Sequence, residues 1–393
     1  MSTIDSQTTQ LPRTVWTLGL VSLLMDTSSE LVHSVLPLFL ATTLGASMAV
    51  IGGIEGTAEA IAQFAKLFSG YLSDRSAKRK PWILFGYGLA ALSKPLFPLA
   101  GSIAMVATAR FTDRIGKGIR GAPRDALLAD VTPPQLLGAA FGLRQALDTV
   151  GAVIGPLSAA VLLYLLADNV RGVLWWAVLP AILCVLTIIL LVREPEDHAG
   201  AVAKTKLSLR EAANLPASFW LTVSAASVLT LARFSEAFLI LRGTSLGVTL
   251  AFAPLVMVLM NVVYTFSSYP AGALSDRIGR KWLLVAGTVA LVGADVALAA
   301  AHDLTVFGIG VALWGLHMGL TQGLLSAMVA DAAPATHRGS AFGAYNAVTG
   351  VAVLIASTLA GALWDVYGAP ATFVAGAIIA TVALALIALR RWN

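Results

Sequence analysis

Stretches of about 20 apolar residues recur along nearly the whole chain, separated by short polar segments. A helix of that length crosses roughly 30 Å of hydrocarbon. The apolar runs are continuous and do not alternate with period two, so they predict helices rather than barrel strands. We predict an all-α integral membrane protein with twelve helices, at about 14–42, 48–72, 81–101, 103–129, 139–165, 172–192, 216–241, 250–272, 282–301, 304–330, 340–363 and 370–389.

The two halves of the chain repeat one another. The segment GYLSDRSAKRK that begins at Gly70 recurs as GALSDRIGRK from Gly272, and ADVTPPQLLGAAFG from Ala129 recurs as ADAAPATHRGSAFG from Ala330. Such self-similarity indicates a duplicated six-helix unit. We therefore predict an N-terminal bundle over residues 1–192, a cytoplasmic linker over 193–215 and a C-terminal bundle over 216–393.

Composition supports a membrane location. Hydrophobic residues make up 58% of the chain and charged residues 12%, which is far more apolar than a soluble domain. The net charge of +5 would suggest nucleic acid in a soluble protein, but here the cations gather in loops on one predicted side. By the positive-inside rule they place both termini in the cytoplasm, in a multi-pass protein of the inner membrane. No nucleic-acid partner is expected.

The N-terminal segment bears on membrane targeting, and the single cysteine bears on disulfide and CxxC sites. Residues 1–13 have an acid and no small-residue cleavage site, so we expect the first helix to be its own insertion signal rather than a removable signal peptide. Cys184 alone makes neither an intrachain disulfide nor a CxxC site.

One densely charged stretch would interrupt a hydropathy plot. RFTDRIGKGIRGAPRD, from Arg110 to Asp125, carries five cations and two anions. At about 100° per residue all seven fall within a sector of about 140° on one helix. A solvent-exposed loop would show no such restriction, so we interpret the stretch as the inward face of the fourth helix.

These repeated motifs resemble those of the major facilitator superfamily, over essentially the full chain. The family signature G-x-L-x-D-R-x-G-R-[RK] reads GYLSDRSAKR in the first copy, with Ala77 in place of a glycine and Lys78 in place of an arginine; the second copy, from Gly272, matches at every position. Arg110 stands where the family has an arginine in its fourth helix. Gly142, Gly151, Gly155 and Pro156 fit a fifth-helix pattern associated with exporters, although Ala159 and Ala160 replace its closing glycines.

The resemblance implies alternating access and suggests gating residues. Charged turns at the cytoplasmic rim would form a latch that closes the inner gate. The candidates are Gly70, Asp74, Arg75, Asp130, Gly272, Asp276 and Arg277, with Gly151, Gly155 and Pro156 on the fifth helix. Two alternatives stay open. In one the cations serve only to fix the orientation of the chain in the membrane, and in the other the glycines serve only to allow close packing of helices.

Charges within the predicted membrane helices are functional candidates, because each costs about 2.5–3.5 kcal/mol at the bilayer centre unless it faces a cavity or a partner. Asp26, Glu30 and His33 fall on one face of the first helix. The resemblance implies that helices 1, 4, 7 and 10 line a central cavity. Desolvation favours a neutral carboxyl and a nearby arginine favours the carboxylate, so such an acid can exchange protons near neutral pH.

We therefore predict proton coupling by Glu30 or Asp26, with Arg110 sensing the charge and Glu236 as a second acid. Static ion pairs that hold the helices in register remain the alternative. The candidate cavity residues are His33, Glu59, Arg110, Asp113, Arg114, Lys117, Arg233, Tyr264, His317 and Gln322. No cofactor and no resident metal are expected, since a lone histidine on a membrane helix usually packs through a hydrogen bond.

The leading hypothesis is a monomeric secondary transporter that exports a small organic compound by antiport with protons. The surplus of arginine and lysine on the fourth helix also permits an anionic metabolite as substrate, since guanidinium groups bind carboxylates and phosphates. A divalent-metal carrier that uses His33 and the nearby acids is a further alternative. No nucleophile elbow, HExxH motif or phosphate loop is present, so the sequence does not predict an enzyme.

Overall fold

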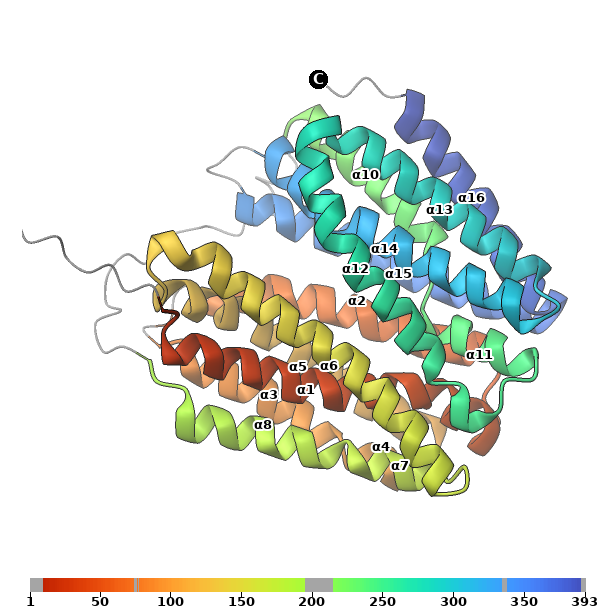
Figure 1. Ribbon diagram of the computed structural model, residues 1–393, viewed down its shortest axis with the longest axis horizontal. Coiled ribbons are helices and arrows are strands. Elements are labelled where there is room, and N and C mark those ends of the chain that lie inside the picture. The colour runs from red at the N-terminus through yellow and green to blue at the C-terminus, as the bar shows by residue number, and fades with distance from the viewer. Residues whose placement is uncertain (1–9, 74–75, 77, 195–214, 334–337, 390–393) are drawn as a thin grey trace, which may run out of the picture.

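The computed structural model describes residues 10–73, 76, 78–194, 215–333 and 338–389, and within these residues every regular element is a helix. The first half of the chain forms one bundle (Figure 1). Its elements are α1 (Arg13–Leu38) with the π-helical turn η1 (Phe39–Thr43), α2 (Met48–Ser73), α3 (Lys80–Ser93), α4 (Leu96–Leu99), α5 (Ile103–Asp130), η2 (Pro134–Leu136), α6 (Leu137–Leu165), α7 (Val170–Trp176) and α8 (Val178–Leu191).

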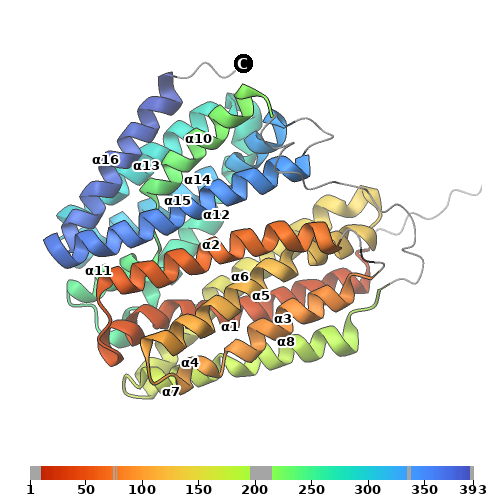
Figure 2. The same cartoon turned by 180° about the vertical axis from the view of Figure 1, so that it is seen from behind.

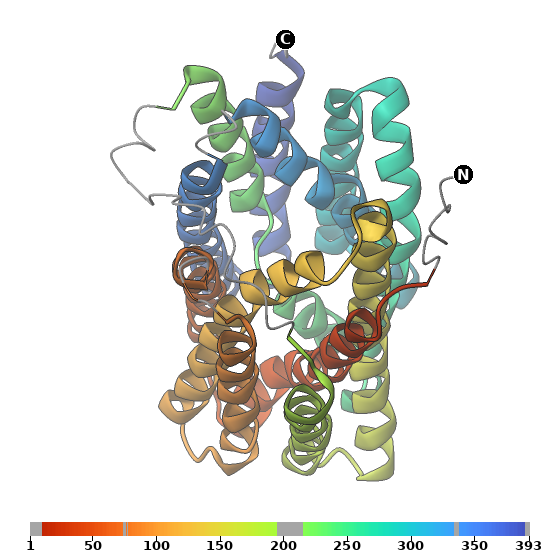
Figure 3. The same cartoon turned by 90° about the vertical axis from the view of Figure 1, so that its left-hand side faces the viewer.

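The second half of the chain forms the other bundle, which lies beside the first (Figures 1 and 3). Its elements are α10 (Ala217–Ala232), α11 (Ala237–Ser245), η3 (Leu250–Phe252), α12 (Leu255–Ile278), α13 (Arg280–Ala300), α14 (Leu304–Ala332), α15 (Arg338–Tyr367) and α16 (Ala369–Leu389).

The observed helices fall on the twelve predicted ranges, and the all-helical fold class is confirmed. Nine helical spans of the described residues are long and apolar enough to cross a membrane by length and composition alone. The spans outside that set are α1, α2 and α5, the helices that carry most of the intramembrane charges discussed below. They fall short because charge lowers their hydropathy, although each has the length of a spanning helix.

Small residues bring neighbouring helices of the first bundle into close contact. A Cβ atom at Gly151 would lie 2.8 Å from the backbone oxygen of Leu23, and one at Gly155 would lie 2.7 Å from that of Thr27. Any larger side chain on this face of α6 would therefore push it away from α1. The predicted close approach of these two helices is confirmed.

The two bundles meet most closely at one end, where α2 begins and α15 ends (Figures 1 and 2). A Cβ atom at Gly56 would lie 2.9 Å from Cα of Leu354, so the backbones of α2 and α15 nearly touch. The Asp365 carboxylate accepts hydrogen bonds from the backbone N–H groups of Met48 (2.9 Å) and Ala49 (2.8 Å). Asp365 thus caps α2 from the other bundle. We call this end, opposite the first residue of α1, the distal end.

Candidate transport cavity

A cavity of about 530 Å³ lies between the two bundles and is lined by residues from both. The first bundle contributes charged groups from α1, α2 and α5, whereas the second contributes mainly aromatic, amide and thioether side chains. The polar residues in the wall are Glu30, His33, Glu59, Gln63, Lys66, Arg114, Lys117, Thr230, Arg233, Ser235, Glu236, Asn261, Tyr264, Gln322, Tyr345, Asn346 and Thr349.

His33 connects the cavity to a buried ion pair. Its Nδ1 lies 3.4 Å from the Glu30 carboxylate, which lines the cavity, and its Nε2 lies 3.8 Å from the carboxylate of Glu55. Glu55 in turn accepts a hydrogen bond of 2.6 Å from Nη2 of Arg110. Glu55 and Arg110 are 1% and 0% exposed, so the pair is sealed from solvent. Glu30 is thus connected to Arg110 through two intervening side chains, His33 and Glu55.

Arg110 and Asp113, both predicted in the cavity wall, lie one layer behind it. Asp113 accepts a hydrogen bond of 2.7 Å from Nζ of Lys94, and the same ammonium group donates to the Ser29 hydroxyl at 3.0 Å. The two residues face neighbouring helices rather than the cavity because their partners, Glu55 and Lys94, sit on α2 and at the end of α3. Buried charges require such pairing.

The next turn of α5 does reach the cavity. Arg114 is 1% exposed and its Nη1 lies 3.1 Å from the Glu59 carboxylate, and both residues line the wall. Lys117 lies one turn further along and also lines the wall. The structure therefore brings Glu30, Glu59, Arg114 and Lys117 together, as the helical rotation predicted.

A second charge network lies toward the end of the bundle where α1 begins. Nη2 of Arg120 lies 3.5 Å from the carboxylate of Asp26, so this candidate proton carrier pairs with α5 and is absent from the residues that line the cavity. Around it, Arg124 contacts Asp125 at 3.0 Å and Asp148 at 3.9 Å, and Arg144 pairs with Asp148.

The seventh predicted helix is broken where it meets the cavity. It was expected to be continuous over 216–241, but α10 ends at Ala232 and α11 begins at Ala237. The segment between them contains Arg233 and Glu236, which both line the cavity. The backbone N–H of Ser235 donates to the Ser357 hydroxyl at 3.1 Å. Unwound backbone inside a membrane requires such partners or a cavity.

The other predicted residues of the second bundle divide between cavity and core. The Tyr264 hydroxyl donates to the Gln322 amide oxygen at 3.1 Å, and both side chains line the wall. His317 is fully buried, with Nδ1 2.8 Å from the carbonyl oxygen of Gly287 on α13. His317 therefore holds α13 and α14 together and is absent from the cavity wall.

The gating candidates are only partly within the described residues. Asp74 and Arg75 lie outside them, and the side chains of Asp276 and Arg277 are likewise not described; Gly70 and Gly272 lie within α2 and α12, and Pro156 within α6. Asp130 pairs with Nε of Arg79 at 2.6 Å, and in the second bundle Arg280 pairs with Asp331. Both pairs span 51 residues and link helices of the same bundle, which extends the sequence repeat to its ion pairs.

Sequence analysis missed two groups of functional interest. Lys94 was overlooked because it precedes Pro95 at the end of α3 and resembles a helix terminus. Its signal was a lysine inside an otherwise apolar predicted span. Asp365, which caps α2 across the two bundles, gave no signal in the sequence, because only the folded chain brings it to Met48.

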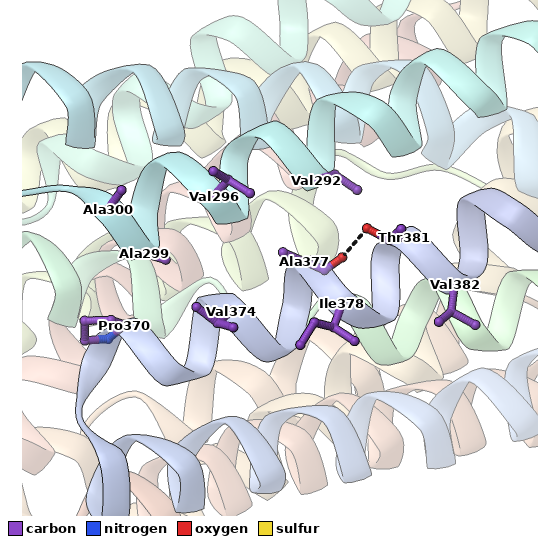
Figure 4. A pocket seen from close by; sticks show the side chains of 10 residues that line it. All are labelled: Val292, Val296, Ala299, Ala300, Pro370, Val374, Ala377, Ile378, Thr381 and Val382. Atoms are coloured by element: carbon purple, nitrogen blue, oxygen red, sulfur yellow. Dashed lines mark hydrogen bonds between the residues drawn. The ribbon is translucent and has the colours of Figure 1, made fainter.

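A second, larger cavity of about 650 Å³ lies between α13 and α16 (Figure 4). It is lined by aliphatic side chains, such as Val292, Val296, Val374 and Ile378, and Thr381 bonds to the carbonyl oxygen of Ala377 within its own helix. Val296 and Ile378 are more than half exposed, so this groove opens on the outer surface of the second bundle. It has no charged group that would select a polar substrate.

The described residues contain no group of three histidine, cysteine or carboxylate side chains that could hold a metal ion. Glu30, His33 and Glu55 come closest, but the Glu55 carboxylate is occupied by Arg110.

The family assignment follows from comparison with known proteins. The model of the Major Facilitator Superfamily matches residues 18–242 and, again, 223–393. The chain belongs to this superfamily. It is 32% identical to an uncharacterised MFS-type transporter of Methanocaldococcus jannaschii, over 95% of this chain and 94% of the relative. It is thus an integral multi-pass membrane protein with the fold of a secondary transporter.

Two further proteins are similar to this chain. The inner membrane transport protein YajR of Escherichia coli is 26% identical to this chain, over 94% of this chain and 81% of the length of YajR. Among solved structures, a bacterial homologue of the human lysosomal transporter Spinster, in an inward-facing and unoccupied conformation, has a TM-score of 0.76. It is 17% identical over 95% of both chains, so it supports the fold alone.

Proposed function

We propose that this superfamily member is a proton-coupled secondary transporter of a small organic compound, with Glu30 as its proton-binding group. The observation that carries the proposal is the series Glu30, His33, Glu55 and Arg110, which joins a carboxyl group in the cavity wall to a buried ion pair. Protonation of Glu30 removes a negative charge beside His33 and so alters the balance of charge across α1, α2 and α5. Such a change can bias two arrangements of the bundles.

Asp26 and Glu236 remain proposed as further proton-binding groups. Asp26 lies beside Arg120 in a separate network, and Glu236 lies in the cavity wall without an ion pair among the described residues. Glu30 is favoured over both because it combines cavity exposure with a defined link to the interior.

The distal end supplies the contact that an alternating-access cycle must break. Asp365 and the start of α2 belong to different bundles, and their hydrogen bonds join the two bundles at this end. If the termini are cytoplasmic, the structure is closed on the outer side. A cycle then requires Asp365 to release Met48 and Ala49.

The proposed transport function has two forms. In one the proton and the substrate move in opposite directions, and in the other they move together. The glycine pattern of α6 favours export by antiport, in which a proton enters as the substrate leaves. Unpaired cations in the cavity favour an anionic substrate, which binds better when Glu30 is neutral and is therefore carried with a proton.

The test is proton movement in proteoliposomes that contain a pH-sensitive dye. A panel of organic cations, neutral compounds and anions is added outside, and a substrate-dependent change of lumen pH that is absent from protein-free vesicles supports the proposal. Glu30→Gln should abolish that change while substrate-for-substrate exchange continues. Undiminished proton movement in this variant would remove Glu30 from the mechanism.

A further inference from the structure

The charged side chains behind the cavity wall balance one another. In the buried layer, two cations face two carboxylates: Lys94 and Arg110 against Glu55 and Asp113. Toward the start of α1, three arginines face three aspartates: Arg120, Arg124 and Arg144 against Asp26, Asp125 and Asp148. Neither set leaves a surplus for a ligand.

The cavity wall itself is not balanced. Its charged groups are four cations, Lys66, Arg114, Lys117 and Arg233, and three carboxylates, Glu30, Glu59 and Glu236. With His33 neutral, four minus three leaves a net charge of +1, and protonation of Glu30 raises it to +2. Arg114 and Glu59 satisfy each other at 3.1 Å. Among the described residues, Lys66, Lys117 and Arg233 have no ion-pair partner.

Two of these unpaired cations, Lys66 and Lys117, line the cavity from adjacent helices at the same level. A Cβ atom at Gly118 would lie 2.9 Å from the backbone nitrogen of Lys66, so α2 and α5 are in direct contact at this level. Lys117, the residue before Gly118, faces the same cavity as Lys66. Two ammonium groups on adjacent helices repel each other, and a bound anion relieves the repulsion.

The opposite wall is suited to an apolar body. Its apolar and aromatic members, from α12, α14 and α15, lie among the amides of the same helices and are Met257, Met260, Tyr264, Met318, Leu325 and Tyr345. Thioether and aromatic side chains pack adaptably against hydrophobic groups. Arg233, in the break between α10 and α11, adds a cation on this side.

Resting on the proposed transport function, we propose that the substrate is an organic anion with an apolar body, whose acidic group is held by Lys66 and Lys117. Arg233 contributes a second anchor from the other bundle. An anion held in this way contacts both bundles, so its binding is coupled to their relative arrangement.

The test is ligand binding to the purified full-length protein in detergent, at constant ionic strength, followed by thermal denaturation. Two matched sets of probes differ only in charge: naphthoate, naphthamide and naphthylmethylamine, and adipate, adipamide and hexanediamine. A ligand that binds only the folded protein raises the melting temperature. We expect a saturable increase with naphthoate or adipate and none with the amides or amines.

Variants locate the site. Lys117→Gln and Lys66→Gln should each weaken binding of the effective acid about tenfold, the factor that corresponds to about 1.4 kcal/mol. Lys78→Gln, the same charge change at an exposed position away from the cavity, should leave binding unchanged. Among the described residues neither cavity lysine has an ion pair to lose, and the melting temperature without ligand checks that each variant folds.

The proposal is overturned if the amides or amines bind as tightly as the acids, if neither acid binds saturably, or if the lysine variants bind as the wild type does. Binding in detergent requires no proton gradient. Tight acid binding without proton movement in proteoliposomes would therefore uphold the substrate class and refute proton coupling, and the reverse result would do the opposite.

Discussion

The two bundles descend from one repeated unit, yet they treat buried charge in opposite ways. In the first, the buried arginines, lysine and carboxylates of α1 to α6 have partners of opposite charge. In the second, the one fully buried carboxylate among the described residues, Asp295 on α13, has no hydrogen-bond partner on either oxygen. The repeat therefore preserved the fold while charge chemistry became concentrated in the first bundle.

This difference indicates a division of labour. Paired charges can be rearranged when one member gains or loses a proton, so the first bundle can couple protonation to movement. The second bundle presents amides, tyrosines and methionines to the cavity and suits recognition of a substrate body. Substitutions in both bundles would break or sharpen this comparison.

The largest effect is expected from Arg110→Met. It leaves the Glu55 carboxylate buried without a partner, and breaking a buried pair in this way costs about 3–5 kcal/mol. Stability is measured by denaturant unfolding of the purified protein in detergent. In the second bundle, Arg233→Met has no pair to break and serves as the control.

Adding Glu55→Gln to Arg110→Met should restore most of the lost free energy of unfolding, because the double variant leaves no buried carboxylate without its partner at this site. If the single and double variants were equally unstable, charge pairing would not be what stabilises the first bundle.

An intermediate effect is expected from Asp113→Asn. The amide still accepts a hydrogen bond from Lys94 but no longer neutralises it, so we expect a loss of about 2 kcal/mol. Asp295→Asn, the same chemical change in the second bundle, should not lower stability, since no hydrogen-bond partner is lost and a buried carboxylate without a partner is removed. Equal effects at the two positions, compared by unfolding under one set of conditions, would contradict the contrast between the bundles.

The smallest effect is expected from Asp365→Asn at the distal end. Loss of a charged cap costs about 1 kcal/mol, which shifts the balance between the two arrangements about fivefold toward opening at that end. A cysteine at Val353, in the cavity wall, would report this as faster labelling by an impermeant maleimide from the distal side. Cys184 is buried and contributes little background.

The control for this variant is Asp168→Asn, which changes the same charge at an exposed position between α6 and α7. Equal labelling rates in both variants would show that Asp365 does not hold the bundles together.

Much of the fold follows from the sequence because its signals are periodic. Apolar runs locate the helices, and rotation at 3.6 residues per turn identifies the buried face of α5, on which Arg110, Asp113 and Arg114 are at most 2% exposed. The pairs Arg79–Asp130 and Arg280–Asp331, which the sequence analysis did not predict, span equal distances along the chain, in keeping with the duplicated motifs.

The pairing of charges and the broken helix depend on distant parts of the chain. Helical rotation places Arg110 on the inward face of α5 but does not identify its ion-pair partner. The packing of α1, α2 and α5 decides that the partner is Glu55 on α2 and not Glu30 on α1. The segment around Arg233 has neither glycine nor proline to announce a break. Its backbone is satisfied by Ser357, a residue more than 100 positions away.

The most direct test of the account is the change of lumen pH when adipate is added outside proteoliposomes, with protein-free vesicles as the control for leakage. A dianion that binds best when Glu30 carries a proton should acidify the lumen, and Glu30→Gln should abolish this acidification while exchange of labelled adipate continues. Alkalinisation of the lumen would select the antiport form of the proposed function instead, and acidification by Glu30→Gln at the wild-type rate would contradict the account.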